Sequence, residues 1–228
     1  STSMFESGIG RGMGFRDSCQ DLLGFVHIIP ERARERILDI AATQFADGSA
    51  YHQYQPLTKK GNLAVGSGFN DDPLWLIACT AAYIKETGDY TILDEMTPYD
   101  SDPSKATDFM EHLRRSFHYT IDHLGPHKLP LIGRADWNDC LRLGKRGEST
   151  FVAMQLYYAM TVIKYFAEMK DDAEYIDYIN SIQYKMGETI QEKCWEDDRF
   201  IRGYKEGGQV IGSKNDPEAS MWLNPQSW

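Results

Sequence analysis

Apolar residues recur at helical spacing along most of this 228-residue chain, and this periodicity limits the folds open to it. We expect a short helix after Asp17, followed by helices over residues 30–46, 74–86, 104–123, 150–170 and 173–193. Apolar strands do not alternate with these helices, which argues against a parallel sheet. The Gly-, Asn- and Pro-rich residues 195–228 are typical of short strands or turns. The sequence therefore predicts an all-α fold of stacked helical hairpins.

Composition narrows the class of protein and of partner. With 228 residues, 42% of them hydrophobic and 25% charged, the chain is long and apolar enough for one sizeable folded domain or two small ones. Its net charge of -10 argues against a nucleic acid or an anionic membrane as partner, since both select basic surfaces. The longest apolar run, residues 74–84, is too short to span a bilayer. We expect no membrane association and no secretory leader.

The cysteines give no sign of a metal site. Cys19, Cys79, Cys140 and Cys194 are scattered and form no C-x-x-C pair. Neither a zinc site nor a compact disulfide framework is therefore indicated. Free thiols in a reducing compartment are the simplest interpretation, so we expect a cytoplasmic protein that uses no metal.

Three short segments repeat one order of residues: an aromatic, then a polar residue, then an aspartate. They are Phe15-Arg16-Asp17, Phe69-Asn70-Asp71 and Trp137-Asn138-Asp139, each just ahead of an expected helix. In a ring of helical hairpins, parallel inner helices would bring such helix starts, with their positive dipole ends, to one mouth. The alternative is three unrelated Asp caps, each with an aromatic residue packed beneath it.

The third of these segments belongs to the most chemically varied stretch, residues 133–141. It holds two carboxylates, an indole, an amide and a guanidinium. A sugar site needs a flat apolar face, acceptors for hydroxyl groups and an acid for the glycosidic oxygen. The competing interpretation is a capped turn with a buried Trp anchor.

Two further stretches favour a ligand site. Residues 1–15 are rich in Gly and Ser, which allows the backbone to approach a ligand closely, but they match no Walker loop and only weakly a dinucleotide loop. Residues 47–72 are expected to form a long loop that contains Tyr51-His52-Gln53-Tyr54-Gln55-Pro56. Long loops inside compact domains are usually functional or disordered, and the aromatic residues favour function.

The motifs in these stretches resemble one enzyme family. They cover residues 10–18, 51–58, 66–76, 129–141 and 224–228, and they are similar to those of cellobiose phosphorylase and the other inverting disaccharide phosphorylases of glycoside hydrolase family 94. The resemblance implies that residues 1–228 are about half of an (α/α)6 barrel catalytic domain, with no second domain. It also implies cleavage of a β-glucosidic disaccharide by inorganic phosphate, with inversion, to α-glucose 1-phosphate and a sugar.

The resemblance also assigns residues to roles. Asp139 matches the family's general acid, and Trp137 matches the tryptophan that lines the sugar site. Arg11, Arg16 and Asp17 match residues that bind the donor sugar, with Arg11 also framing phosphate. We add Asp71 and Tyr54, from the second repeated segment and the aromatic loop, as substrate-binding residues. No cofactor is implied beyond phosphate as co-substrate, and a homodimer is expected for the full-length protein.

Phosphorolysis needs one catalytic carboxyl group, whereas inverting hydrolysis needs two. Phosphate is already a nucleophilic oxyanion, whereas an inverting hydrolase needs a second carboxylate, here Asp17 or Asp71, as base. The acid must stay protonated, so we expect Asp139 to be buried or close to a second acid. Asp136 is a candidate for that neighbour, or alternatively caps the turn. An inverting hydrolase and a non-catalytic carbohydrate-binding unit remain the alternative functions, and the short segment 143–149 points to a substrate other than cellobiose.

Overall fold

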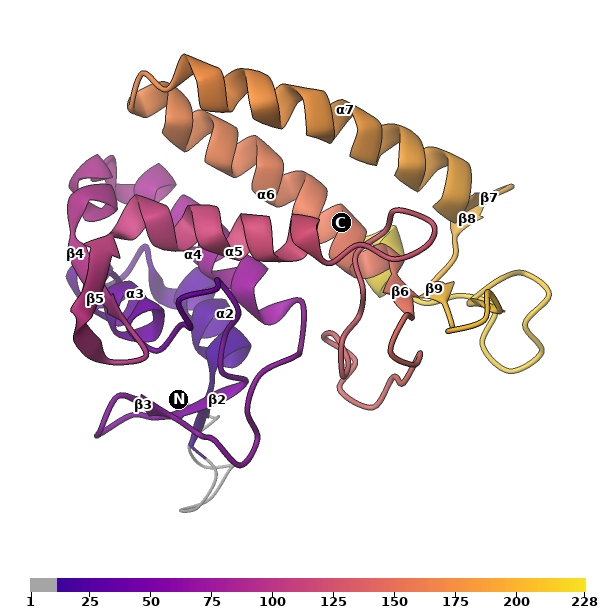
Figure 1. Cartoon of the computed structure of the whole chain (residues 1–228), viewed down its shortest axis with the longest axis horizontal. Coiled ribbons are helices and arrows are strands. Elements are labelled where there is room, and N and C mark those ends of the chain that lie inside the picture. The colour runs from indigo at the N-terminus through magenta and orange to yellow at the C-terminus, as the bar shows by residue number, and fades with distance from the viewer. Residues whose placement is uncertain (1–11) are drawn as a thin grey trace. The chain divides into compact units, whose positions relative to one another are not determined.

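The computed structural model describes residues 12–228, which divide into two compact units (Figure 1). The first unit comprises the described residues up to Gly68 together with Asp72–Tyr119. The second comprises Phe69–Asp71 and Thr120–Trp228. Each unit has its own helices and its own small sheets.

Three helices form the centre of the first unit: α2 (Phe15–Phe25), α3 (Pro30–Ala41) and α4 (Asp72–Thr87). They pack against one another, with Phe15, Leu22 and Ile37 among the buried side chains. α3 begins at Pro30, whose fixed φ suits the first helical position and whose missing N–H costs no hydrogen bond there. α4 is buried almost all round over its first ten residues, as expected for a central helix.

Short antiparallel strands complete the first unit. β1 (Met13–Gly14), β2 (Gln53–Gln55) and β3 (Lys60–Gly61) form one sheet in that order, so the expected long loop contains two strands. The 3-10 helix η1 (Tyr90–Asp94) precedes a hairpin of β4 (Met96–Tyr99) and β5 (Asp102–Asp108).

The β4–β5 hairpin replaces the predicted first turns of a helix from residue 104. Asp100 and Ser101, the two loop residues, have φ values of 49° and 56°, and Tyr99 pairs with Asp102. Two residues with positive φ form the tight turn that matches the twist of an antiparallel hairpin. α5 (Phe109–Asp122) therefore begins five residues later than predicted.

His112 of α5 is fully buried in the first unit. One ring nitrogen lies 2.8 Å from Gln44 Oε1, and the other lies 3.0 Å from the carbonyl oxygen of Thr97. The ring stacks on Tyr99 with centroids 3.9 Å apart. Burial lowers the pKa of His112 to about 4, because the charged imidazolium would lose its hydration.

This burial predicts acid sensitivity. Between about pH 6.5 and 4, His112 is protonated in the unfolded state but neutral in the folded state. The free energy of unfolding is therefore highest above pH 6.5 and decreases as the pH falls below that value. We expect His112 to contribute a loss of about 3 kcal/mol in unfolding free energy across this window. Urea unfolding at a series of pH values measures it, with His112→Gln, which retains hydrogen-bonding groups, as reference. Equal pH slopes in the two proteins would contradict the prediction.

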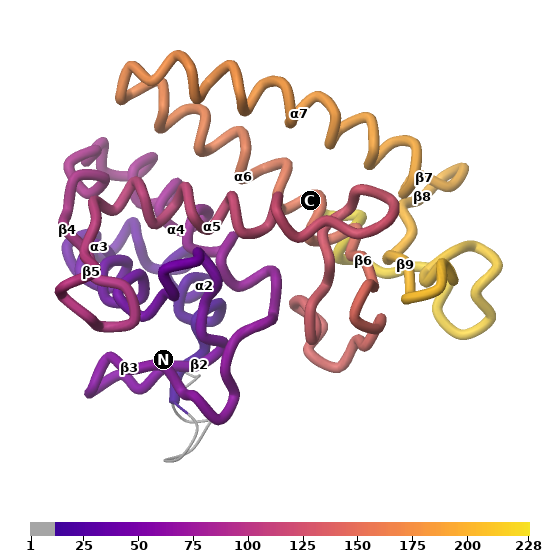
Figure 2. Tube along the Cα trace, viewed as in Figure 1, coloured from indigo at the N-terminus to yellow at the C-terminus, as the bar shows by residue number. Residues whose placement is uncertain are grey.

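The second unit is built on the helical pair α6 (Thr150–Met169) and α7 (Ala173–Cys194), which run side by side (Figure 2). Ser149 caps α6 by accepting a hydrogen bond from the Val152 N–H at 3.1 Å. Asp172 caps α7 by accepting from the Tyr175 N–H at 3.2 Å. Both caps satisfy N–H groups that have no partner inside the helix.

The segment after α7 folds back on the start of α6. β6 (Glu148–Ser149), β9 (Gly203–Tyr204) and β10 (Val210–Ile211) form a sheet with β9 in the middle. β7 (Trp195–Glu196) pairs with β8 (Arg199–Phe200), and the 3-10 helix η2 (Asn224–Gln226) lies near the end. A Cβ on Gly203 would lie 2.2 Å from the carbonyl oxygen of Glu148, so only glycine allows this approach of β9 to β6.

The expectation of an all-α fold with half of an (α/α)6 barrel was wrong. Residues 12–228 contain four small antiparallel sheets between and around the helices α2–α7. Most of these strands have two or three residues, too few to produce a period-two signal in the sequence. Among residues 12–228, no helix combines the length and apolar character needed to cross a membrane. The single-domain organisation of residues 1–228 stays a prediction.

Candidate functional site

Asp139 lies in an exposed turn of the second unit. The turn is closed by a hydrogen bond from the Leu141 N–H to the Asn138 carbonyl oxygen at 2.8 Å. The Arg142 guanidinium donates to the carbonyl oxygens of Asp139, at 2.9 Å, and of Arg134. Of the two settings expected for Asp139, burial or a nearby acid, burial is therefore not found. Asp139 is instead an exposed residue on a turn whose backbone is held on both sides.

Trp137 is 43% exposed on the same turn. The buried Trp anchor in the alternative interpretation of this stretch is therefore wrong. No helix starts directly after the turn, because α6 begins at Thr150, where the apolar spacing predicted it. An exposed indole two residues from an exposed aspartate is a combination that could stack on a sugar ring and contact its hydroxyl groups.

Asp136, in contrast, is fully buried and holds the base of the turn. Its Oδ1 pairs with Arg202 Nη2 at 2.5 Å and accepts the Asn138 N–H at 3.1 Å. Its Oδ2 accepts a hydrogen bond from Ser149 Oγ at 2.6 Å. Of the two roles considered for Asp136, these contacts match the capping of the turn.

The second repeated segment lies against the stretch that leads into this turn. Phe69 forms bridges to Gly133 and Ala135, and Asn70 Nδ2 donates to the Leu131 carbonyl oxygen at 2.6 Å. Asp71 is fully buried. The structure thus brings the second and third repeated segments together in one unit, while the first belongs to the other unit.

In the first unit, Arg16 and Asp17 occupy the first turn of α2. Arg16 is buried, with Nε 3.9 Å from Asp17 Oδ1, and the Asp17 side chain is 49% exposed. The Asp17 carboxylate fills the space that a Cβ at Gly14 would need, 2.1 Å away. It lies at the positive end of the helix dipole. Asp17 is thus a held, accessible acceptor, whereas Arg11 falls outside the described residues.

Tyr54 is fully buried, so its ring offers no open face to a sugar. Its hydroxyl group lies 3.0 Å from Ser18 Oγ, and the Arg36 guanidinium lies 5.7 Å from the ring centroid. Burial is the main cause that raises its pKa. These contacts tie β2 to α2 and α3.

A buried His–Asp pair lies beside α2. His52 Nδ1 is 2.9 Å from Asp72 Oδ2, and the Asp72 carboxylate is inaccessible to solvent. Burial raises the pKa of Asp72, and the nearby His52 and Arg16 partly oppose this rise. The Phe15 N–H donates to the His52 carbonyl oxygen at 3.0 Å. The pair therefore anchors the start of α2, where Arg16 and Asp17 lie.

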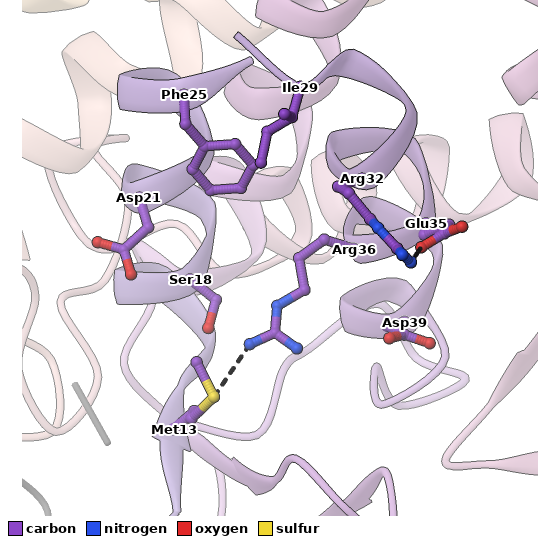
Figure 3. Close-up of a pocket in the computed structure, with 9 residues that line it drawn as sticks. All are labelled: Met13, Ser18, Asp21, Phe25, Ile29, Arg32, Glu35, Arg36 and Asp39. Carbon is purple, nitrogen blue, oxygen red and sulfur yellow. Dashed lines mark hydrogen bonds and ion pairs between the residues drawn. The ribbon is translucent and has the colours of Figure 1, made fainter. Parts of the chain in front are cut away.

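A cavity of about 330 Å³ opens between α2 and α3 in the same unit (Figure 3). The Arg36 guanidinium points into it and donates to Met13 Sδ at 2.9 Å, while Arg32 pairs with Glu35 at its rim. Neither Arg16 nor Asp17 lines this cavity. Within residues 12–228, no three His, Cys, Asp or Glu side chains gather closely enough to hold a metal ion.

The model of one family, described as the glycosyl hydrolase 94 superfamily, catalytic domain, matches residues 1–228. The chain belongs to this superfamily. The resemblance inferred from the motifs is confirmed at the level of the family.

Individual family 94 relatives are similar over nearly the whole chain. Solabiose phosphorylase of Paenibacillus borealis is 31% identical over 227 residues, which are 98% of this chain and 28% of that protein. N,N'-diacetylchitobiose phosphorylase of Vibrio furnissii is 28% identical, over 97% of this chain and 30% of that protein. The cyclic beta-(1,2)-glucan synthase NdvB of Rhizobium meliloti is 30% identical, over 94% of this chain and 8% of that protein. The chain spans less than a third of each of these relatives.

Sequence reasoning missed two pairs in this family 94 chain, Arg202–Asp136 and His52–Asp72. Arg202 lies 66 residues from Asp136 and outside every motif that was singled out. In the sequence, His52 stands out only as one residue of the aromatic loop. The one sequence signal for the second pair was a histidine within a segment rich in hydrogen-bonding side chains.

Proposed function

We propose that the protein is an inverting phosphorylase that cleaves a β-glucosidic, cellobiose-like disaccharide with inorganic phosphate. The products are α-glucose 1-phosphate and the released sugar. Membership of family 94 and two relatives named as disaccharide phosphorylases support this reaction class. The observation that carries the proposal is the turn on which Asp139 and Trp137 are exposed together.

In this proposal Asp139 is the general acid. A phosphate oxygen attacks the anomeric carbon from the face opposite the leaving group, while the glycosidic C–O bond breaks and Asp139 transfers its proton to the departing oxygen. The carboxylate left on Asp139 regains a proton from solvent, which its exposure permits. Phosphate brings its own negative oxygen, so no second carboxylate is required.

We assign the binding of the donor sugar to two residues that are accessible in the structure. Trp137 supplies the stacking face, and Asp17 supplies an acceptor for sugar hydroxyl groups. Arg16, Asp71 and Tyr54 are buried, so within this proposal each acts through the residues around it and not through an open face. Arg11 keeps its proposed role in framing phosphate.

The setting of the reaction is also part of the proposal. Cys19, Cys79, Cys140 and Cys194 are all free thiols, which fits a reducing cytoplasm. We propose that the acceptor sugar differs from the glucose that cellobiose would release, because segment 143–149, which follows Asp139, is short. A homodimer is proposed for the intact protein, and light scattering of the purified protein tests it.

Phosphate dependence is the decisive experiment. The intact protein is incubated with cellobiose, solabiose and N,N'-diacetylchitobiose, each with and without inorganic phosphate. We expect ³¹P NMR to detect the α-anomer of a sugar 1-phosphate with at least one of these substrates. We expect no sugar release when phosphate is omitted.

Sugar release that continues without phosphate would instead identify an inverting hydrolase. That enzyme would need a base that reaches water about 6.5–9.5 Å from the acid. Asp71 is inaccessible to solvent, which disfavours it for this role. Binding of the disaccharide without any turnover in either assay would identify a carbohydrate-binding unit and refute the proposal.

A further inference from the structure

Arg202 is a fully buried guanidinium in the second unit, between β8 and β9. The backbone N–H of Arg202 donates to the Ile211 carbonyl oxygen at 2.7 Å, and the Arg202 carbonyl oxygen accepts a hydrogen bond from the Thr150 N–H at 3.2 Å. Gly203 allows this segment to lie directly against β6. The backbone of Arg202 is therefore held by β10 on one side and by the start of α6 on the other.

Its side chain joins three acceptors on two other segments. Nη2 lies 2.5 Å from Asp136 Oδ1 and 2.8 Å from Asn138 Oδ1, and Nη1 lies 3.1 Å from Ser149 Oγ. The guanidinium carbon is also 5.9 Å from the Phe151 ring centroid and 5.5 Å from that of Trp222. Aromatic rings thus limit where the guanidinium group can move.

These contacts flank the residues to which we assign catalysis and stacking. Asp136 and Asn138 are the neighbours of Trp137 on either side, and Asn138 is bonded directly to Asp139. Asn138 is held twice, through its side chain by Arg202 and through its carbonyl oxygen by the Leu141 N–H. A shift of the guanidinium would therefore rotate the turn that carries the proposed acid.

We propose that Arg202 is a positioning residue that aims the Trp137–Asp139 turn, and this inference rests on the proposed function. Arg202 does not reach the substrate, because it is inaccessible to solvent. It acts by fixing the geometry of the proton donor, and a misplacement of about 1 Å in such a group can lower a rate by about 10²-fold.

The role requires arginine specifically. The planar guanidinium presents donors in fixed directions, so one group can hold Asp136, Asn138 and Ser149 at once. A lysine can preserve the ion pair with Asp136, but its single ammonium group on a flexible stem cannot hold all three acceptors in this geometry. Arg202→Lys therefore keeps the buried charge balanced while releasing the turn.

Hydrogen exchange of the intact protein, followed by mass spectrometry of peptides, tests the positioning without relying on activity. We expect Arg202→Lys to speed amide exchange in residues 134–142 by about tenfold or more, with α7 unchanged. Arg199→Lys is the matched control, since Arg199 lies on β8 and pairs with the exposed Asp198. Asn138→Ala, which leaves the ion pair intact, should also speed exchange there and serves if Arg202→Lys does not fold. Unchanged exchange in residues 134–142 in both variants would overturn the inference.

Steady-state kinetics then distinguish a positioning role of Arg202 from a role in stability alone. In the phosphate-dependent assay we expect Arg202→Lys to lower kcat by about 10²-fold, with KM for sugar and phosphate changed by less than about threefold. Arg199→Lys should keep wild-type values. An unchanged kcat in folded Arg202→Lys would overturn the inference. An inactive wild-type protein would refute the proposed function instead, and the exchange result would still decide whether Arg202 orders the turn.

Discussion

Asp139→Asn is expected to lower kcat for phosphorolysis by about 10²–10⁴-fold, the range that a general acid contributes. The amide has nearly the same shape as the carboxyl group but cannot give up a proton to the leaving oxygen. The side chain is exposed and the turn is closed by backbone hydrogen bonds, so the melting temperature should not change. Initial rates of sugar 1-phosphate formation and a thermal unfolding scan measure the two quantities.

A substrate with a better leaving group sharpens this test. A 2,4-dinitrophenyl β-glucoside releases 2,4-dinitrophenolate, which departs without protonation, so Asp139→Asn should cleave this substrate with phosphate at a rate close to that of the wild-type protein. Asp177→Asn, an exposed carboxyl group on α7, is the matched control and should behave as wild type with both substrates. Normal turnover of the disaccharide by Asp139→Asn would refute the assignment of the acid.

The second large effect concerns stability, at the buried pair of Asp136 and Arg202. Asp136→Leu leaves the Arg202 guanidinium charged, inaccessible to solvent and without its carboxylate, since both side chains are 0% exposed. We expect the free energy of unfolding to fall by about 3–5 kcal/mol. Urea unfolding, followed by circular dichroism, measures this loss.

A double variant tests whether this loss of stability comes from the unpaired buried charge of Arg202. Asp136→Leu combined with Arg202→Met removes both charges, and it should recover most of the stability lost in the single variant. Asp198→Leu is the control, because its partner Arg199 forms the pair at the surface, and its stability should match that of the wild type. A single variant as stable as the control would contradict a structural role for the buried pair.

The helices could be predicted from the sequence because each encodes its own boundaries. Pro30 marks the start of α3, the Asp72–Pro73 pair marks that of α4, and the apolar spacing over residues 150–193 predicts α6 and α7. These signals are local: they depend on the periodicity of one segment and on residues that cap its ends.

The strands could not be predicted in the same way. β6, β9 and β10 have two residues each, and their pairing depends on backbone groups that meet from distant parts of the chain. In the β4–β5 hairpin, the turn depends on positive φ at Asp100 and Ser101, which neither residue signals as strongly as glycine would. The sequence therefore predicts a helix start at residues 104–108, where the structure has part of β5.

The sequence by itself determined the family of this protein, most of its helices and the order of residues in its candidate sugar-binding turn. All three are written in short contiguous stretches, such as Trp137-Asn138-Asp139. Only the tertiary structure decided which carboxylate of that turn is accessible and which is buried. Asp136 is buried because Arg202, 66 residues further along the chain, supplies the charge that makes its burial tolerable. Asp139 lies three residues further along the same stretch and is exposed in the folded unit.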